Sequence, residues 1–199
     1  MKQISLWYVS RIVQDDIVNE FVSSISVPGL FVSVERKEEY PIQAGLEWLA
    51  PTALIVFLAK PYFESFLSEM GKDHYNLLKK ALKAVANRLL GRRGPKIRRI
   101  SKGKAENSIK YSIAFSIYVD VSENLTLKLL FPAELEEEDV HEMIEAYLNF
   151  IEALYAGKIG ETLVAKLSSG RLIGKTMLVA YDIETKELNP VDPIPTNRN

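Results

Sequence analysis

A run of strictly alternating apolar residues in the middle of the chain constrains the fold more than any other feature. Every second position is apolar in this run, namely Ile109, Tyr111, Ile113, Phe115, Ile117, Val119 and Val121. Because successive side chains of a β-strand point to opposite faces of a sheet, this period predicts a long, half-buried antiparallel strand. Ser122-Glu123-Asn124 then predicts a turn into a second strand over residues 125–131, so we expect a hairpin here.

The start of the chain has a pattern that predicts a β-α-β unit. Residues 3–9 alternate between apolar and other side chains and predict a strand. Asp15-Asp16 precede apolar residues at helical spacing as far as Ile25, and Pro28-Gly29 mark the end of this helix. Residues 30–36 predict a second strand, and a right-handed crossover would place the two strands parallel.

Residues 48–59 form an uncharged, strongly apolar run between Glu47 and Lys60. Proline fits the first turn of a helix, where its missing N–H costs nothing, so Pro51 and Pro61 predict two short helices. A membrane-spanning helix needs about 20 apolar residues, and this run is shorter and interrupted. A buried core helix is therefore the favoured interpretation, with an oligomer interface or a membrane contact as the alternatives.

Two longer helices are predicted from apolar residues at helical spacing. The first has Asp73 as its N-cap and runs to about Leu90, where Gly91 ends it. The second covers residues 140–155 and ends at Gly157.

The remaining elements complete the predicted fold. Residues 162–167 predict a short helix, and residues 176–182 predict a last strand with a short partner after it. Together the elements predict an α+β fold: an antiparallel-rich β-sheet with helices packed mainly on one face, opening with the β-α-β unit. We expect a single domain over residues 1–188 with a possible hinge at 91–95, followed by an extended Pro-rich tail over residues 189–199.

The composition excludes several classes of protein. The 199 residues include 25 Lys+Arg and 26 Asp+Glu, a net charge of -1 that gives no overall attraction to nucleic acid or an anionic membrane. The chain has no cysteine and only two histidines, His74 and His141, which excludes thiolate and three-histidine zinc sites. We therefore expect no metal and no cofactor. The absence of cysteine, together with a first segment unlike a signal peptide, favours a cytoplasmic location.

A basic segment over residues 79–104 contains eleven Lys and Arg and no acidic residue. Its central members are the candidate residues for binding a polyanion or a partner: Arg92, Arg93, Lys96, Arg98 and Arg99. Such a density can follow a phosphate backbone, because cations that neutralise phosphates release counterions. The segment has no aromatic residues on which bases could stack, so a solvated basic surface is the alternative.

An acidic segment over residues 134–152 is the natural counterpart of the basic segment. Its candidate partner-binding residues are Glu136, Glu137, Glu138 and Glu142. Negative charge in the first turn of a helix is favoured by the helix dipole, which explains part of the cluster. We also expect the acidic segment to meet the basic segment, either within the chain or across a two-fold dimer.

Catalytic patterns are weak. His141 and Glu145 are four residues apart on one helix, a spacing typical of an exposed side-chain pair, and His74 lies beside the predicted cap Asp73. Glu64 and Glu69 could form a carboxylate pair in a cleft.

The sequence thus favours a non-catalytic, cytoplasmic macromolecular-interaction protein with separate basic and acidic patches. Its expected partner is itself, as a homo-dimer or higher oligomer, or another protein, and no membrane contact is expected. One alternative is a binder of nucleic acid or a phosphate ligand through residues 79–104. A second alternative is an enzyme with a carboxylate-based site.

Overall fold

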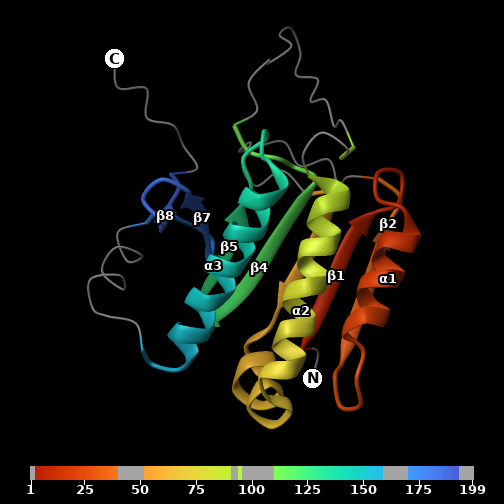
Figure 1. The fold of residues 1–199 in the computed structure, drawn as a ribbon, viewed down its shortest axis with the longest axis vertical. Coiled ribbons are helices and arrows are strands. Elements are labelled where there is room, and N and C mark those ends of the chain that lie inside the picture. The colour runs from red at the N-terminus through yellow and green to blue at the C-terminus, as the bar shows by residue number, and fades with distance from the viewer. Residues whose placement is uncertain (1–2, 40–51, 91–93, 96–109, 159–169, 193–199) are drawn as a thin grey trace, which may run out of the picture.

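The computed structural model describes residues 3–39, 52–90, 94–95, 110–158 and 170–192 of the chain. Over these residues it contains an eight-stranded sheet and three long helices that lie side by side on one face of that sheet (Figure 1). The predicted α+β class and the placement of the helices on one face are confirmed.

The sheet is built from three successive β-α-β units whose strands lie next to each other. The first is β1 (Ile4–Val9), α1 (Asp15–Ile25) and β2 (Val32–Lys37); the second is β3 (Leu54–Leu58), α2 (Leu67–Leu89) and β4 (Phe115–Ser122); the third is β5 (Leu125–Leu130), α3 (Glu137–Tyr155) and β7 (Thr176–Asp182). The strand order is β2-β1-β3-β4-β5-β7, with the short strands β6 (Leu172–Ile173) and β8 (Glu187–Pro190) pairing with β7.

Strands are parallel within each unit and antiparallel between neighbouring units. The sheet is therefore mixed, and the prediction of an antiparallel-rich sheet is only partly correct. The reason is that a helical crossover returns the chain in the same direction, whereas a hairpin reverses it. β4 combines both cases, because it pairs antiparallel with β5 and parallel with β3.

The first and third crossovers have opposite hands. In Figure 1, β1 and β2 run upward with α1 in front and β2 to the right, which is the usual right-handed arrangement. β5 and β7 also run upward, but β7 lies to the left of β5 while α3 covers the same face of the sheet. The third crossover is therefore left-handed, which is rare.

The apolar run at residues 48–59 contains a strand in place of the helix predicted after Pro51, whereas the chain is helical after Pro61, as predicted. Leu54–Leu58 is β3, a central strand between β1 and β4, and its alternate residues Leu54, Val56 and Leu58 are fully buried. A central strand needs no charged face, so it presents a continuous apolar run that periodicity alone does not distinguish from a buried helix.

The helix that follows also begins earlier than predicted. A π-helical turn, η2 (Tyr62–Phe66), leads directly into α2, which passes through Gly71 and Asp73 without interruption. Asp73 is therefore not an N-cap. His74 is not a neighbour of a cap but a buried residue, whose Nδ1 lies 3.0 Å from the Tyr62 hydroxyl and whose Nε2 lies 2.8 Å from the Ile25 carbonyl oxygen.

The core lies between the sheet and the three helices, and two buried tyrosines within it donate to backbone carbonyl oxygens. Tyr75 donates to the Leu148 carbonyl oxygen at 2.5 Å, and Tyr147 donates to that of Leu127 at 3.0 Å. A buried hydroxyl without such a partner would cost its full desolvation energy. These tyrosines therefore fix the position of α2 relative to α3, and of α3 relative to the sheet.

The C-terminal part differs from the prediction in one respect. The sequence predicts that an extended tail begins at residue 189, but Asn189 and Pro190 belong to β8 and pair with β7. Proline is tolerated here because β8 lies at the edge of the sheet. The end of α3 is as predicted, with Gly157 at a positive φ of 65°. The predicted short helix at 162–167 lies outside the described residues.

None of the described helices is long and apolar enough to cross a bilayer.

Candidate functional site

The basic and acidic segments meet through charged side chains where α2 packs against α3. Glu145 of α3 accepts from Lys79 at 2.8 Å and from Lys83 at 2.7 Å, both on α2. The side chain of Lys79 is only 12% exposed and also donates to Asn149 at 2.6 Å. Partial burial raises the pKa of Glu145, but the hydrogen bonds from Lys79 and Lys83 outweigh it and hold that pKa below its usual value. In the described part of the chain, the two segments thus meet within one chain.

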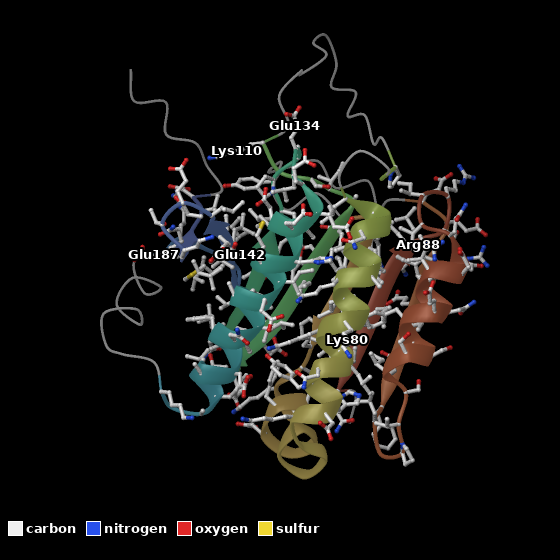
Figure 2. The ribbon with its side chains drawn as sticks, viewed as in Figure 1. Lys80, Arg88, Lys110, Glu134, Glu142 and Glu187 are labelled. Carbon is white, nitrogen blue, oxygen red and sulfur yellow. The ribbon has the colours of Figure 1, made fainter. Side chains whose placement is uncertain are left out.

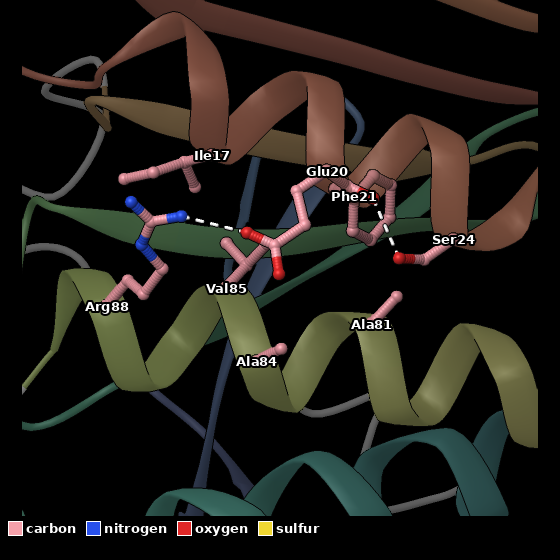
Figure 3. A pocket seen from close by; sticks show the side chains of 8 residues that line it. All are labelled: Ile17, Glu20, Phe21, Ser24, Ala81, Ala84, Val85 and Arg88. Carbon is pink, nitrogen blue, oxygen red and sulfur yellow. Dashed lines mark hydrogen bonds and ion pairs between the residues drawn. The ribbon is translucent and has the colours of Figure 1, made fainter.

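Arg88 holds α2 to α1 on the other side. Its guanidinium lies 2.6 Å from Asp16 and 2.9 Å from Glu20, the second of which is drawn in Figure 3. The hydrogen bond from Arg88 lowers the pKa of Asp16. The cavity between these helices has a volume of about 20 Å³, which holds about one water molecule and no larger ligand. Its lining of small residues such as Ala81 and Ala84 reflects close helix packing (Figure 3).

The predicted acidic partner residues are spread over the start of α3. Glu142 accepts from Lys186 at 2.5 Å and from Tyr181 at 2.8 Å, and the bond from Lys186 is the main cause of its lowered pKa. Figure 2 places Glu142 on the side of α3 that faces β7 and β8. Glu137 accepts from Asn87 of α2 at 2.5 Å. Glu136 precedes the first turn of α3, and Glu138 is exposed in it.

The expected pair between His141 and Glu145 is wrong. His141 Nε2 lies 2.9 Å from the Asn87 side-chain oxygen, while Glu145 is occupied by the two lysines of α2. Both His141 and Glu145 contact side chains of α2, because α2 and α3 pack through this face. Glu64 pairs with Lys60 at 3.0 Å.

Other predicted site residues lie outside the described part of the chain. They are Arg92, Arg93, Lys96, Arg98 and Arg99, together with the side chain of Glu69. Their role in binding a polyanion or a partner stays a prediction.

The outer edge of β2 is a second candidate surface, and the sequence did not identify it as an edge. The carbonyl oxygens of Phe31 and Lys37 accept bonds from β1 and the residue after it, so odd-numbered residues of this strand turn their backbone groups inward. Even-numbered residues turn theirs away from the sheet. Phe31 is 61% exposed and Val34 is 46% exposed, which makes them two of the most exposed large apolar residues among those described.

Charged residues lie at the end of the same strand. Lys37 pairs with Glu35 at 2.5 Å, and Arg36 lies 3.7 Å from Asp15 of α1. Charges are a common way of protecting an edge strand from unwanted pairing. The sequence Glu35-Arg36-Lys37 is the signal that could have identified this edge.

A buried lysine lies on the face of the sheet opposite the helices. Lys128 of β5 is 2% exposed, and its Nζ lies 5.2 Å from the centre of the Tyr118 ring on β4. Burial lowers the pKa of Lys128 to about 8. On the same face, Thr126 donates to Asp120 at 2.8 Å. Sequence reasoning missed Lys128, because a charged residue at an alternate position of a strand usually faces water.

An open groove of about 600 Å³ lies beside the end of β7 and β8. Its lining includes Lys110, Tyr111, Asp182 and Asp192. The ammonium group of Lys110 lies 5.4 Å from the centre of the Tyr111 ring, and Asp182 accepts two backbone bonds within the β7–β8 turn. The groove has both signs of charge on its rim but no paired nucleophile and base among its described residues. No group of three metal-ligating side chains occurs in the described ranges.

Comparison with protein-family models, with curated proteins and with solved structures gives no match to this chain. Its function is therefore argued from its own residues.

Proposed function

We propose that this protein is a non-catalytic, cytoplasmic interaction protein that associates with itself, and that its contact surface includes the β2 edge. The observation that carries the proposal is the exposure of Val34 in the edge strand β2, at 46%, and of Phe31 directly before it, at 61%. An exposed apolar side chain on its own is ordinary, but two of them beside a strand edge that no described strand covers favour association.

The charge pairs support this choice over a polyanion-binding surface on α2. Lys79, Lys83 and Arg88 belong to the basic segment, and each lies within hydrogen-bonding distance of a carboxylate of the same chain. A cation that is already paired with a carboxylate is less available to neutralise a phosphate. Fewer counterions are then released from the nucleic acid, and binding is weaker. The alternative polyanion site would therefore depend on the other cations of residues 79–104.

The experiment is native mass spectrometry and light scattering of the purified protein over a range of protein and salt concentrations. We expect a dimer or higher oligomer that persists in high salt, because apolar and backbone contacts are not screened. A mass equal to one chain at every concentration would contradict the proposal. Dissociation in salt alone would point to the charged segments, and retained nucleic acid in the spectrum would favour the polyanion-binding alternative.

A matched pair of variants then tests the apolar contact. Phe31→Ser removes an exposed phenyl ring at the edge, whereas Leu77→Ser removes an apolar side chain that is 42% exposed on α2. Burying a large apolar side chain contributes about 1.5–3 kcal/mol, so Phe31→Ser should raise the dimer Kd at least about tenfold. Leu77→Ser should leave the Kd unchanged.

A further inference from the structure

We propose that two copies of the chain join edge to edge, with β2 antiparallel to β2 of the partner subunit around a two-fold axis. The sheet would then continue across the interface. This inference rests on the proposed self-association and specifies its surface, its partner and its register.

The backbone of β2 has the hydrogen-bonding groups that such a contact needs. Since the odd-numbered residues of β2 bond to β1, Val32, Val34 and Arg36 turn their N–H and C=O groups outward. No described residue pairs with this outer side. Edge groups of this kind are a template for another strand, and a second copy presents the same set.

Symmetry restricts the possible registers. A two-fold axis perpendicular to the sheet keeps the same face of both copies on the same side. Opposed residues then point to the same face, so one residue of β2 must lie opposite the same residue of the partner subunit. The two residues nearest the middle of β2 are Val34 and Glu35. Centring the contact on Glu35 would oppose two carboxylates, which is unfavourable, whereas centring it on Val34 opposes two apolar side chains.

The register centred on Val34 also suits the other side chains. It places Ser33 opposite Glu35 of the partner subunit, and Phe31 opposite Lys37 of the partner subunit. No two like charges are directly opposed. A lysine beside an exposed phenyl ring adds a favourable cation–π contact. Meanwhile the pairs of Arg36 with Asp15 and of Lys37 with Glu35 can stay within each copy.

A self-complementary strand favours a second copy over an unrelated partner. The outward groups repeat at Val32, Val34 and Arg36, so the antiparallel arrangement satisfies Val32 with Arg36 of the partner subunit and Val34 with its own equivalent. An isologous contact needs no surface other than this strand.

Cysteine cross-linking tests the register directly, because the chain contains no cysteine. In an antiparallel sheet, the Cα atoms of a hydrogen-bonded pair are about 5.5 Å apart, which is within the range of a disulfide. Under mild oxidation Val34→Cys should form a covalent dimer, and the exposed control Leu77→Cys should stay monomeric on a denaturing gel. Equal cross-linking of both variants would overturn the proposal.

Val34→Pro tests the backbone contact. Proline removes an N–H that no described strand of the same copy pairs with, so the variant should keep its fold, verified by circular dichroism, and lose the dimer. Val34→Lys opposes like charges on the axis and should give the same loss even if Val34→Pro folds poorly. Val34→Thr keeps the backbone and should keep the dimer.

The outcomes separate the two proposals. A wild-type monomer at all concentrations overturns both. If the wild type is a dimer and both Val34→Lys and a folded Val34→Pro remain dimers, the β2 contact is overturned. The proposal of self-association would then still stand. A dimer that both variants dissociate, and that Val34→Cys cross-links, is the expected result.

Discussion

Lys128 on β5 lies directly opposite Tyr118 on β4, with its ammonium nitrogen 5.2 Å from the centre of the tyrosine ring. The lysine is 2% exposed on the face of the sheet that the helices do not cover. Burial disfavours the charged form of a lysine and lowers its pKa. The contribution of Lys128 to the free energy of unfolding therefore depends on pH.

Lys128→Met should make the protein more stable at neutral pH. The pKa of Lys128 is about 8 in the folded chain, against 10.5 for an ordinary lysine, and burial is the cause. Below pH 8 both states bind the proton, and the folded state bears the cost of the buried charge. A shift of this size corresponds to a cost on the order of 3 kcal/mol, so removing it should raise the free energy of unfolding by about 1–3 kcal/mol.

The direction in which the free energy of unfolding changes with pH is the control for this prediction. Between pH 8 and 10.5 the unfolded chain still holds the proton that the folded chain has lost, so wild-type stability should rise with pH relative to Lys128→Met. Urea unfolding of both proteins from pH 7 to alkaline pH measures this difference. A gap between the two curves that does not narrow as pH rises would contradict the lowered pKa.

Glu145→Gln should weaken the contact between α2 and α3. Lys79 and Lys83 would both lose a charged acceptor, and Lys79 is almost covered. We expect a loss of about 1 kcal/mol in the free energy of unfolding, because Glu145 itself is partly exposed and screened. Glu138→Gln, on the exposed side of the same helix, is the control and should change stability by less than about 0.5 kcal/mol.

The stability that Glu145 contributes through this contact should also depend on pH. The pKa of Glu145 is lower when folded than its usual 4.5, so its contribution is present above that value and is lost as pH falls through the folded pKa. Chemical unfolding at decreasing pH should therefore bring wild type and Glu145→Gln together. A constant difference down to the acid limit would show that the lost stability is not electrostatic.

The sequence predicted those elements whose residues repeat with a clear period. In β1, β4, β5, α1 and α3, the apolar residues that face the core recur every second position or every three to four. β3 was missed because all five of its residues are apolar, so its sequence has no alternation that distinguishes a strand from a buried helix. The mixed pairing was also hidden, since it depends on which strands become neighbours and not on the pattern within any one strand.

The candidate surfaces were harder to predict for the same reason. The charge separation between the basic and acidic segments was visible in sequence, but only packing decides that Arg88 meets α1 while Lys79 meets α3. That β2 forms an edge follows from strand order, which local sequence does not specify. Likewise, Lys128 has the position of an exposed residue in the strand pattern, and its burial is a tertiary property.

Buried tyrosines should set the alkaline limit of stability. Tyr75 and Tyr147 donate to backbone carbonyls in the core, and desolvation raises the pKa of each above the usual 10.0. Above pH 10 the unfolded chain loses these protons while the folded chain retains them, so the free energy of unfolding should fall as pH increases. Tyr75→Phe should make this fall less steep, while costing about 1 kcal/mol at neutral pH through the lost hydrogen bond to Leu148. Tyrosinate absorbance followed together with circular dichroism measures the effect. Complete ionisation of all tyrosines near pH 10 in a chain that remains folded would contradict it.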